Sequence, residues 1–306
     1  MEWTAQKKQK LKRAVFIISF LIVPTVNFLL FYVYVNLNSI LLAFQKNVNG
    51  ETYWTFDTMR SLFGRLFPMD NEMREIFTNT FATFGINLCL FLVGVFVSYF
   101  LYKKIFLYQA FRVLFYLPSI LSAVVMCAVY QQLLSVNGEI AQWVQKIMNL
   151  EYPPEFLADS RFANAAVWIN MIWLTFPGNL IIWGGTFARV PEGVIESARL
   201  DGVNWLQEAF RIIIPIVWPT FALMFVLQLA GIFGATGQVF LLTQGEWGTQ
   251  TISSWMYIQV YATSLDRTSN LFNQMSALGL VLTLISCVIT LIVRNVAGRA
   301  FKGVEY

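Results

Sequence analysis

The sequence lacks histidine entirely and is poor in charged residues, which make up 12% of its 306 positions. Without histidine there is no His-based general acid or base, no serine triad of the usual kind, no His zinc site and no His-ligated haem. Soluble domains carry about 25% charged residues. Half that share cannot cover a surface exposed to water, so the composition indicates a membrane protein that crosses the bilayer several times.

The sequence also has few cysteines and no phosphate-binding loop of the P-loop type. The three cysteines, Cys89, Cys127 and Cys287, all fall in apolar stretches, where a thiol is usually a small core residue and no disulfide framework is indicated. The sequence contains no G-x-x-x-x-G-K-[ST] loop, so ATP hydrolysis, if it occurs, must take place on another polypeptide. The net charge of +4 is too small to indicate nucleic-acid binding, and no metal site is expected.

Long stretches without charge are what the sequence has in abundance. A charged side chain at the centre of a spanning helix costs roughly 2.5–3.5 kcal/mol, and about 20 apolar residues suffice to cross the hydrocarbon core. The mean hydropathy is +0.60. These features predict an all-α integral membrane protein with six spanning helices, at residues 14–35, 77–101, 112–134, 163–187, 216–242 and 274–294.

The first span follows a basic segment, residues 1–13, and could therefore be a signal peptide. Its apolar run continues through Val35, which is longer than a signal peptide requires, and no A-x-A-like cleavage site follows at once. We therefore expect a retained helix, followed by an external loop at residues 36–76 in which Asn49-Gly50 is a turn signal. A short tail, residues 301–306, ends the sequence.

The charges predict the orientation of the chain. Of the 21 Lys and Arg residues, fourteen fall in segments on the side of the termini and seven on the opposite side. Basic residues gather on the cytoplasmic side of membrane proteins. Both termini are therefore expected in the cytoplasm, with the loops after the second and fourth spans on the same side.

The loop at residues 189–215 differs from a simple connector. Pro191 suits the first turn of a helix, and Val194, Ile195 and Ala198 form an apolar strip behind it. Gly202 suits a left-handed helix end. A second amphipathic segment follows; its apolar residues are Trp205, Leu206, Ala209, Phe210 and Ile213. The pattern predicts two helices joined at a glycine, which either lie on the lipid surface or dock to a cytoplasmic partner.

This loop resembles the EAA motif of ABC importer permeases, the inner-membrane components of binding-protein-dependent transport systems. That pattern is Glu-Ala-Ala, three residues, Gly, nine residues, Ile, one residue and Leu-Pro. The matching positions are Glu196, Ser197, Ala198, Gly202, Ile212, Ile214 and Pro215. Serine replaces one alanine and isoleucine replaces the leucine, while Asp201-Gly202 resembles the carbohydrate branch, which includes the maltose and glycerol-phosphate permeases.

The resemblance extends over roughly residues 75–300. Residues 114–134 resemble the third-span signature of the family, and residues 245–251 resemble its outside loop without the usual proline. It implies a permease core at residues 77–300, in the inner membrane of a bacterium. It also implies that the chain is not an enzyme and that ATP and Mg²⁺ are bound by a cytoplasmic ATPase dimer. Further implied partners are a second homologous permease, an external solute-binding protein, membrane lipid and a sugar or oligosaccharide substrate.

The residues of the loop receive roles from the same resemblance. Glu196 is expected to contact the ATPase, Gly202 to make the turn and Ala198 to allow close approach; Ser197, Asp201, Ile212 and Pro215 complete the coupling element. The alternative for Glu196 is a pair with Arg199 within the helix. Movement of the docked helix would switch the cavity between inward-open and outward-open states.

A sugar pathway requires polar groups and aromatic faces inside the spans. The candidates are Asn170, Trp173 and Thr175 in the fourth span and Gln228 and Ile232 in the fifth. Gln131 and Gln132 are polar residues near the end of the third span. Any of these side chains could instead bond a neighbouring helix, which is the commoner fate of a buried amide.

Three other functions compete with sugar import. An ABC permease for a polyol phosphate or a peptide remains open, although no span carries, away from its ends, the Lys or Arg that an anionic substrate would require. A secondary carrier would need ionisable residues in its spans. An integral-membrane enzyme would need clusters of catalytic residues at membrane depth, and six charge-free spans argue against it.

Overall fold

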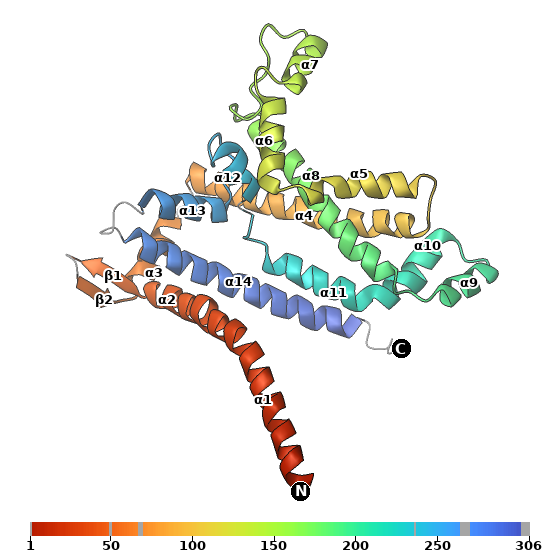
Figure 1. Ribbon diagram of the computed structural model, residues 1–306. Helices are drawn as coiled ribbons and strands as arrows, with labels where there is room; N and C mark the ends of the chain where they lie inside the picture. The colour runs from red at the N-terminus through yellow and green to blue at the C-terminus, as the bar shows by residue number, and fades with distance from the viewer. Residues whose placement is uncertain (1, 49–50, 67–69, 236, 264–269, 301–306) are drawn as a thin grey trace. The chain divides into compact units, whose positions relative to one another are not determined.

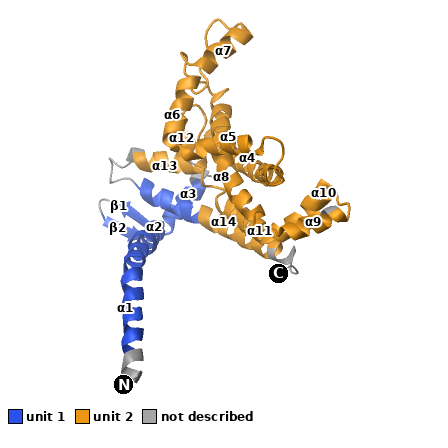
Figure 2. Ribbon diagram, turned by 45° about the vertical axis from the view of Figure 1, so that its right-hand side comes forward, with its two compact units in different colours: residues 1–67, 262–281 blue, residues 68–261, 282–306 orange. Residues whose placement is uncertain are grey.

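The computed structural model describes residues 2–48, 51–66, 70–235, 237–263 and 270–300. The chain is mostly helical and divides into two compact units (Figures 1 and 2); one comprises residues 1–67 and 262–281, the other residues 68–261 and 282–306. Among the described residues, five helices are long and apolar enough to cross a membrane, and a bent pair of helices makes a sixth. The predicted all-α membrane fold is therefore confirmed, apart from one short β-hairpin.

The first unit begins with a helix that is longer than predicted. Helix α1 (Glu2–Asn27), the π-helix η1 (Phe28–Tyr34) and α2 (Val35–Leu42) follow one another without a break. The helix therefore includes most of the predicted N-terminal segment and extends past residue 35 into the predicted external loop. Neither end of the apolar run contains a residue that stops a helix, which is why charge alone located the boundaries poorly.

The described residues of the predicted loop 36–76 that follow α2 form a hairpin, a helix and the start of α4. Strands β1 (Gln45–Val48) and β2 (Glu51–Trp54) pair antiparallel, and α3 (Asp57–Leu66) follows. The predicted turn residues Asn49 and Gly50 lie outside the described residues. The hairpin is held within its unit because the Asn270 side chain accepts from the Asn47 N–H at 2.7 Å and donates to the Asn47 carbonyl at 3.0 Å.

The second unit is built on two long helices, α4 (Asn71–Tyr102) and α8 (Ala163–Phe187), which pack against each other. Helix α4 begins where the Asp70 carboxylate accepts from the Met73 N–H at 2.9 Å, a typical N-cap. Helix α8 coincides with the predicted fourth span, and α4 contains the predicted second span. These two helices position the candidate site.

The predicted third span, residues 112–134, consists of two helices joined at a sharp bend rather than one straight helix. Helix α5 (Tyr108–Ile120) ends where α6 (Ala123–Leu134) begins, and α7 (Glu139–Met148) follows closely. The axis bends by 100° at this break. Pro118 removes a backbone donor near the end of α5, and the Ser119 hydroxyl donates to the Tyr116 carbonyl at 2.7 Å, which competes with helical bonding.

The predicted fifth span, residues 216–242, is displaced toward the N-terminus. Three segments form one continuous helical run: α10 (Trp205–Gln207), the π-helix η2 (Glu208–Ile213) and α11 (Ile214–Ala230). The run ends at Gly231, and the short helix α12 (Gly237–Thr243) occupies the last part of the predicted span. Glycine costs helix stability, and a charge-free sequence does not reveal such interruptions.

The last two helices are α13 (Ile252–Thr263) and α14 (Leu271–Ala300). Helix α14 contains the predicted sixth span and extends beyond both of its ends, and its residues are divided between the two units. The predicted tail, residues 301–306, lies outside the described residues.

Candidate functional site

The EAA-like sequence forms a short helix, α9 (Glu192–Leu200), that follows α8 directly. Its predicted apolar strip is largely buried: Ile195 and Ala198 are 5% and 4% exposed, and Val194 is half-buried. Glu196 and Ser197 lie on the opposite, exposed face. The helix therefore packs by one face and leaves the polar part of the motif accessible.

Gly202 ends α9 in the left-handed region, with φ of +73°. The Val203 N–H donates to the Ala198 carbonyl at 3.1 Å, as in the Schellman motif. On the other side of the turn, Asn204 and Gln207 form a capping box at the start of α10. Both halves of the turn are thus closed by hydrogen bonds, which makes the joint between the two helices well defined.

The second half of the loop is continuous with α11. In η2 the bonding pattern widens, and the Ile214 N–H donates to the Ala209 carbonyl five residues earlier. Pro215 lies at the start of α11, where its missing N–H is tolerated. Ile212 and Pro215 are half-buried. The predicted pair of helices joined at a glycine is therefore present, but its second helix is the first part of a membrane helix rather than a separate element.

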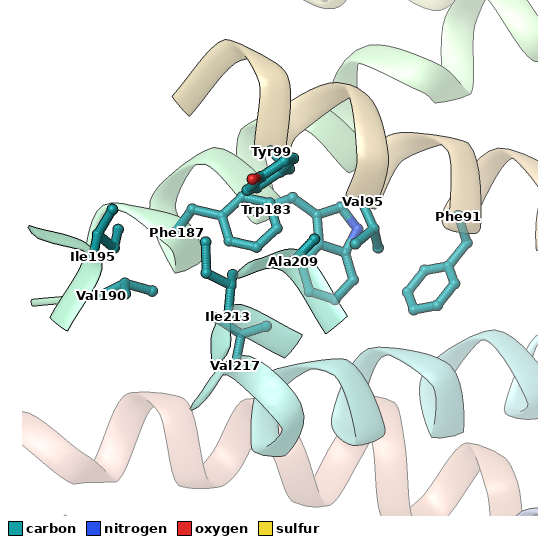
Figure 3. Close-up of a cluster of buried hydrophobic side chains, with 10 residues drawn as sticks. All are labelled: Phe91, Val95, Tyr99, Trp183, Phe187, Val190, Ile195, Ala209, Ile213 and Val217. Carbon is teal, nitrogen blue, oxygen red and sulfur yellow. The ribbon is translucent and has the colours of Figure 1, made fainter. Parts of the chain in front are cut away.

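A cluster of buried side chains joins this loop to the membrane helices (Figure 3). It combines residues of α4, α8, α9, η2 and α11 with one residue of the connector between α8 and α9: Phe91, Val95, Tyr99, Trp183, Phe187, Val190, Ile195, Ala209, Ile213 and Val217. Burying a large apolar side chain stabilises a protein in water by about 1.5–3 kcal/mol. The cluster therefore fixes α9 against the ends of α4 and α8.

The other predicted residues of the loop face outward. Asp201 and Gly202 are exposed, and Leu200 beside them is 89% exposed. The Ser197 hydroxyl donates to the Gly193 carbonyl at 2.8 Å. The predicted pair between Glu196 and Arg199 involves a side chain, that of Arg199, outside the described residues.

Glu208 is a residue of the loop that the sequence did not single out. It is 2% exposed, and Lys103 donates to its two carboxylate oxygens at 2.7 and 2.6 Å. Lys103 caps the C-terminal end of α4. The amphipathic pattern would have placed an acidic residue at this position on the polar face, and only the three-dimensional arrangement brings a lysine to it.

Inside the second unit, α4, α8 and α11 enclose a pocket of about 180 Å³. Its lining combines aromatic, amide and aliphatic side chains: Phe91, Asn179, Ile182, Trp183, Met224, Leu227 and Gln228. The Asn179 Nδ2 atom is buried and has no hydrogen-bond partner among the described residues. The pocket thus offers unused donor capacity beside two aromatic rings.

Of the predicted pathway residues, Gln228 lines this pocket and the other four do not. Asn170 is fully buried and accepts from the Cys127 thiol at 3.5 Å. Trp173 is 39% exposed, Thr175 is half-buried and Ile232 is 8% exposed. Sequence reasoning missed Asn179 and Trp183, although Asn179 is also a polar residue inside the fourth span.

Gln131 bonds a neighbouring helix, which was the alternative to a place in the sugar pathway. Its Nε2 donates to the carbonyls of Leu241 and Leu242 at 3.0 and 3.1 Å. These bonds join α6 to α12 within the second unit. Gln131 is therefore engaged with a neighbouring helix.

The segment at residues 245–251, which resembles the outside loop of the family, is held by side chains of α4 and α8. Asn79 and Asn164 both donate to the Gly248 carbonyl, at 2.7 and 2.9 Å. The Thr80 hydroxyl accepts from the Ile252 N–H at 2.8 Å. This polar cluster ties the segment to the ends of α4 and α8 opposite the 189–215 loop.

Residues 90–302 match the family described as binding-protein-dependent transport system inner membrane component. The chain belongs to this family. The matched region contains the whole 189–215 loop and all the residues that line the pocket. The family resemblance predicted from the loop is thereby confirmed.

Individual relatives are similar to the chain at modest identity. The maltose/maltodextrin transport system permease protein MalF of Vibrio vulnificus is 25% identical over 198 residues, which are 64% of this chain and 36% of MalF. The present chain therefore spans little more than a third of the length of MalF. The multiple sugar-binding transport system permease protein MsmF of Streptococcus mutans is 22% identical over 275 residues, 90% of this chain and 92% of MsmF.

A solved structure shows the same fold. A chain in the crystal structure of a bacterial ABC transporter involved in the import of the acidic polysaccharide alginate superposes with a TM-score of 0.77 at 20% identity. The match covers 96% of the present chain and 99% of the chain of the alginate transporter. The ABC importer permease fold predicted from the sequence is therefore confirmed.

Proposed function

We propose that the chain is the membrane-spanning permease subunit of an ATP-driven ABC importer and translocates a sugar or oligosaccharide delivered by an external solute-binding protein. The 189–215 loop is the observation that carries this proposal. Its α9 helix is packed against the ends of α4 and α8, and Gly202 joins it to a helix continuous with α11. A partner that moves α9 would therefore move membrane helices with it.

The proposed assembly contains a second homologous permease and a cytoplasmic ATPase dimer that binds ATP and Mg²⁺. This chain performs no catalysis. Glu196, Ser197, Ala198 and Asp201 would form the docking face, with Gly202 as its turn; Ile212 and Pro215 would transmit the movement. Both termini and the 189–215 loop would lie in the cytoplasm of a bacterium, because most basic residues fall on that side.

The pocket between α4, α8 and α11 supports a sugar as the substrate. Amides at Asn179 and Gln228 can bond hydroxyl groups, and the rings of Phe91 and Trp183 can contact the C–H faces of a pyranose. The pocket lining contains no charged residue, which favours a neutral sugar. The relatives MalF, a maltose/maltodextrin permease, and MsmF, a multiple-sugar permease, support the same substrate class.

The test is purification from the native membrane with an affinity tag on this chain, followed by reconstitution into liposomes. The expected result is recovery with a second permease and an ATPase. ATP-dependent uptake of labelled maltotriose, a neutral oligosaccharide, should then require the solute-binding protein. The chain purified alone should show no ATPase activity.

Two outcomes would contradict the proposal. Uptake driven by a proton or sodium gradient without ATP would identify a secondary carrier. ATP-dependent uptake of glycerol phosphate or a peptide, with no oligosaccharide transported, would replace the sugar by another solute.

A further inference from the structure

An ion pair that the family motif does not contain joins the 189–215 loop to the end of α4. The Lys103 ammonium donates to both carboxylate oxygens of Glu208, at 2.7 and 2.6 Å. The Tyr99 hydroxyl donates to Glu208 at 3.3 Å and to the Trp205 carbonyl at 3.2 Å. One carboxylate therefore gathers three donor–acceptor contacts from the last turn of α4.

This pair is shielded from water. The side chains of Lys103 and Glu208 are 21% and 3% exposed, and the Lys103 Nζ lies 5.9 Å from the centre of the Tyr99 ring. Two ring contacts flank it, Phe100 with Trp205 at 5.6 Å and Phe96 with Phe210 at 5.9 Å. A buried ion pair is weak evidence for stability, because apolar residues can often replace it at no cost. Its position is therefore more informative than its strength.

The position of Glu208 is where the loop could otherwise bend. Glu208 is the first residue of η2, the π-helix that lies between the Gly202 turn and Pro215. Segments of π-helix and prolines are the usual places where helices kink. A displacement of α9 would reach α11 through η2, and the ion pair fixes η2 to the end of α4.

We propose that Lys103 and Glu208 are positioning residues that make α4 move together with α11 when the 189–215 loop is displaced. Tyr99 completes the link. Without it, η2 would bend and part of the movement of the loop would be lost before it reaches the membrane helices. This inference rests on the proposed function, since it assigns the route by which ATP hydrolysis is coupled to transport.

The experiment uses the complete transporter, with the quantity of solute transported per ATP hydrolysed as the readout. The test variant is the double substitution Lys103→Met with Glu208→Gln, which removes both charges together and leaves none buried without a partner. We expect normal assembly with the ATPase and continued ATP hydrolysis, with the ratio of solute to ATP reduced about tenfold, within the range that coupling residues produce. A purely structural role would lower the amount of assembled complex and leave this ratio unchanged.

Two further variants complete the design. The swap Lys103→Glu with Glu208→Lys should restore part of the lost ratio, since it rebuilds the pair in reverse. Lys104→Met is the matched control, because Lys104 is the exposed neighbour of Lys103, and it should transport normally. An unchanged ratio in the double neutral variant would overturn the inference. Failure of the proposed function is distinguishable, because the unmodified transporter would then show no ATP-dependent uptake at all.

Discussion

The Asn79 side chain donates to the Gly248 carbonyl at 2.7 Å across 169 positions of sequence. The same amide nitrogen donates to the Gln250 carbonyl at 3.1 Å. Asn79 is 5% exposed, and Gly248 has φ of +71°. One buried amide of α4 therefore bonds two carbonyls of this segment, and it shares the Gly248 carbonyl with Asn164 of α8.

Replacement of Asn79 by Ala should destabilise the protein by about 1–3 kcal/mol, because the Gln250 carbonyl loses the Asn79 donor and the Gly248 carbonyl keeps only its bond from Asn164. Thermal unfolding in detergent would measure the change. Thr78→Ala is the matched control, since Thr78 is exposed and donates only to the Arg74 carbonyl in its own helix. Equal stability of the two variants would mean that the amide does not hold the segment.

Gly202→Pro should abolish transport while the protein still reaches the membrane. Proline requires φ near −65°, whereas Gly202 has φ of +73°, so the turn between α9 and α10 cannot form. Glu196→Lys should have the same effect by reversing the charge of the docking face. Uptake into cells, corrected for membrane abundance by immunoblot, is the measurement.

Gly193→Ala is the control for the glycine turn. Gly193 is helical, and a methyl group there would meet no atom within 4 Å. This variant should transport like the unmodified protein. Full transport by Gly202→Pro would exclude a coupling role for the turn.

Asn179→Leu and Gln228→Leu should each raise the KM for oligosaccharide about fivefold, since loss of one hydrogen bond to a substrate typically costs about 1 kcal/mol. ATP hydrolysis without substrate should not change. Gly178→Ala, at a neighbouring position of α8 where a methyl group meets nothing within 4 Å, is the control. If Asn170→Leu raised KM and the two pocket variants did not, the pathway would lie elsewhere.

Asp159 provides a pH-dependent contact outside the spanning segments. Hydrogen bonds from the Arg161 side chain and N–H hold the pKa of the Asp159 carboxyl below its usual value of 3.8. A lowered folded-state pKa stabilises the protein above the usual value, and this contribution disappears as pH falls through the lowered pKa. The pair is exposed, so its contribution is small and decreases with salt.

The difference in Tm between the unmodified protein and Asp159→Asn should therefore be larger at pH 7 than at about pH 3. Glu151→Gln, which changes an exposed carboxylate of the same segment, controls for the general effect of charge. A difference that grew on acidification would contradict the assigned sign.

The sequence predicted those parts of the fold that depend on local composition. Helix α8 coincided with its charge-free stretch, and Gly202 adopted the left-handed conformation that its position at a helix end required. The breaks at Ser122 and Gly231 were not predicted. Both lie within apolar runs, and the pairs Pro118-Ser119 and Gly231-Gly234 were the only local signals of them.

In the candidate site, too, the features that depend on local sequence were predictable and those that depend on contacts between helices were not. The buried and exposed faces of α9 follow from helical periodicity, and Gln228 is polar in an apolar span. Asn179 was equally polar, but the sequence cannot show which side of α8 faces α4 and α11. The pair of Lys103 with Glu208 depends on the return of α10 to the end of α4, and no local pattern encodes such a contact.

The π-helix η2 also determines which way the residues of α11 face. A π-helical turn contains one residue more than an α-helical turn, and each residue of an α-helix advances the chain by about 100° of rotation. Deletion of one residue from η2 would therefore restore ordinary α-helical bonding and leave the side chains of α11 close to their present rotation relative to α9. If η2 became α-helical with all of its residues retained, α11 would turn by about 100° and Gln228 would leave the wall of the pocket. The π-helical bonding of η2 thus sets the rotational phase between the loop and the helix that carries the pocket.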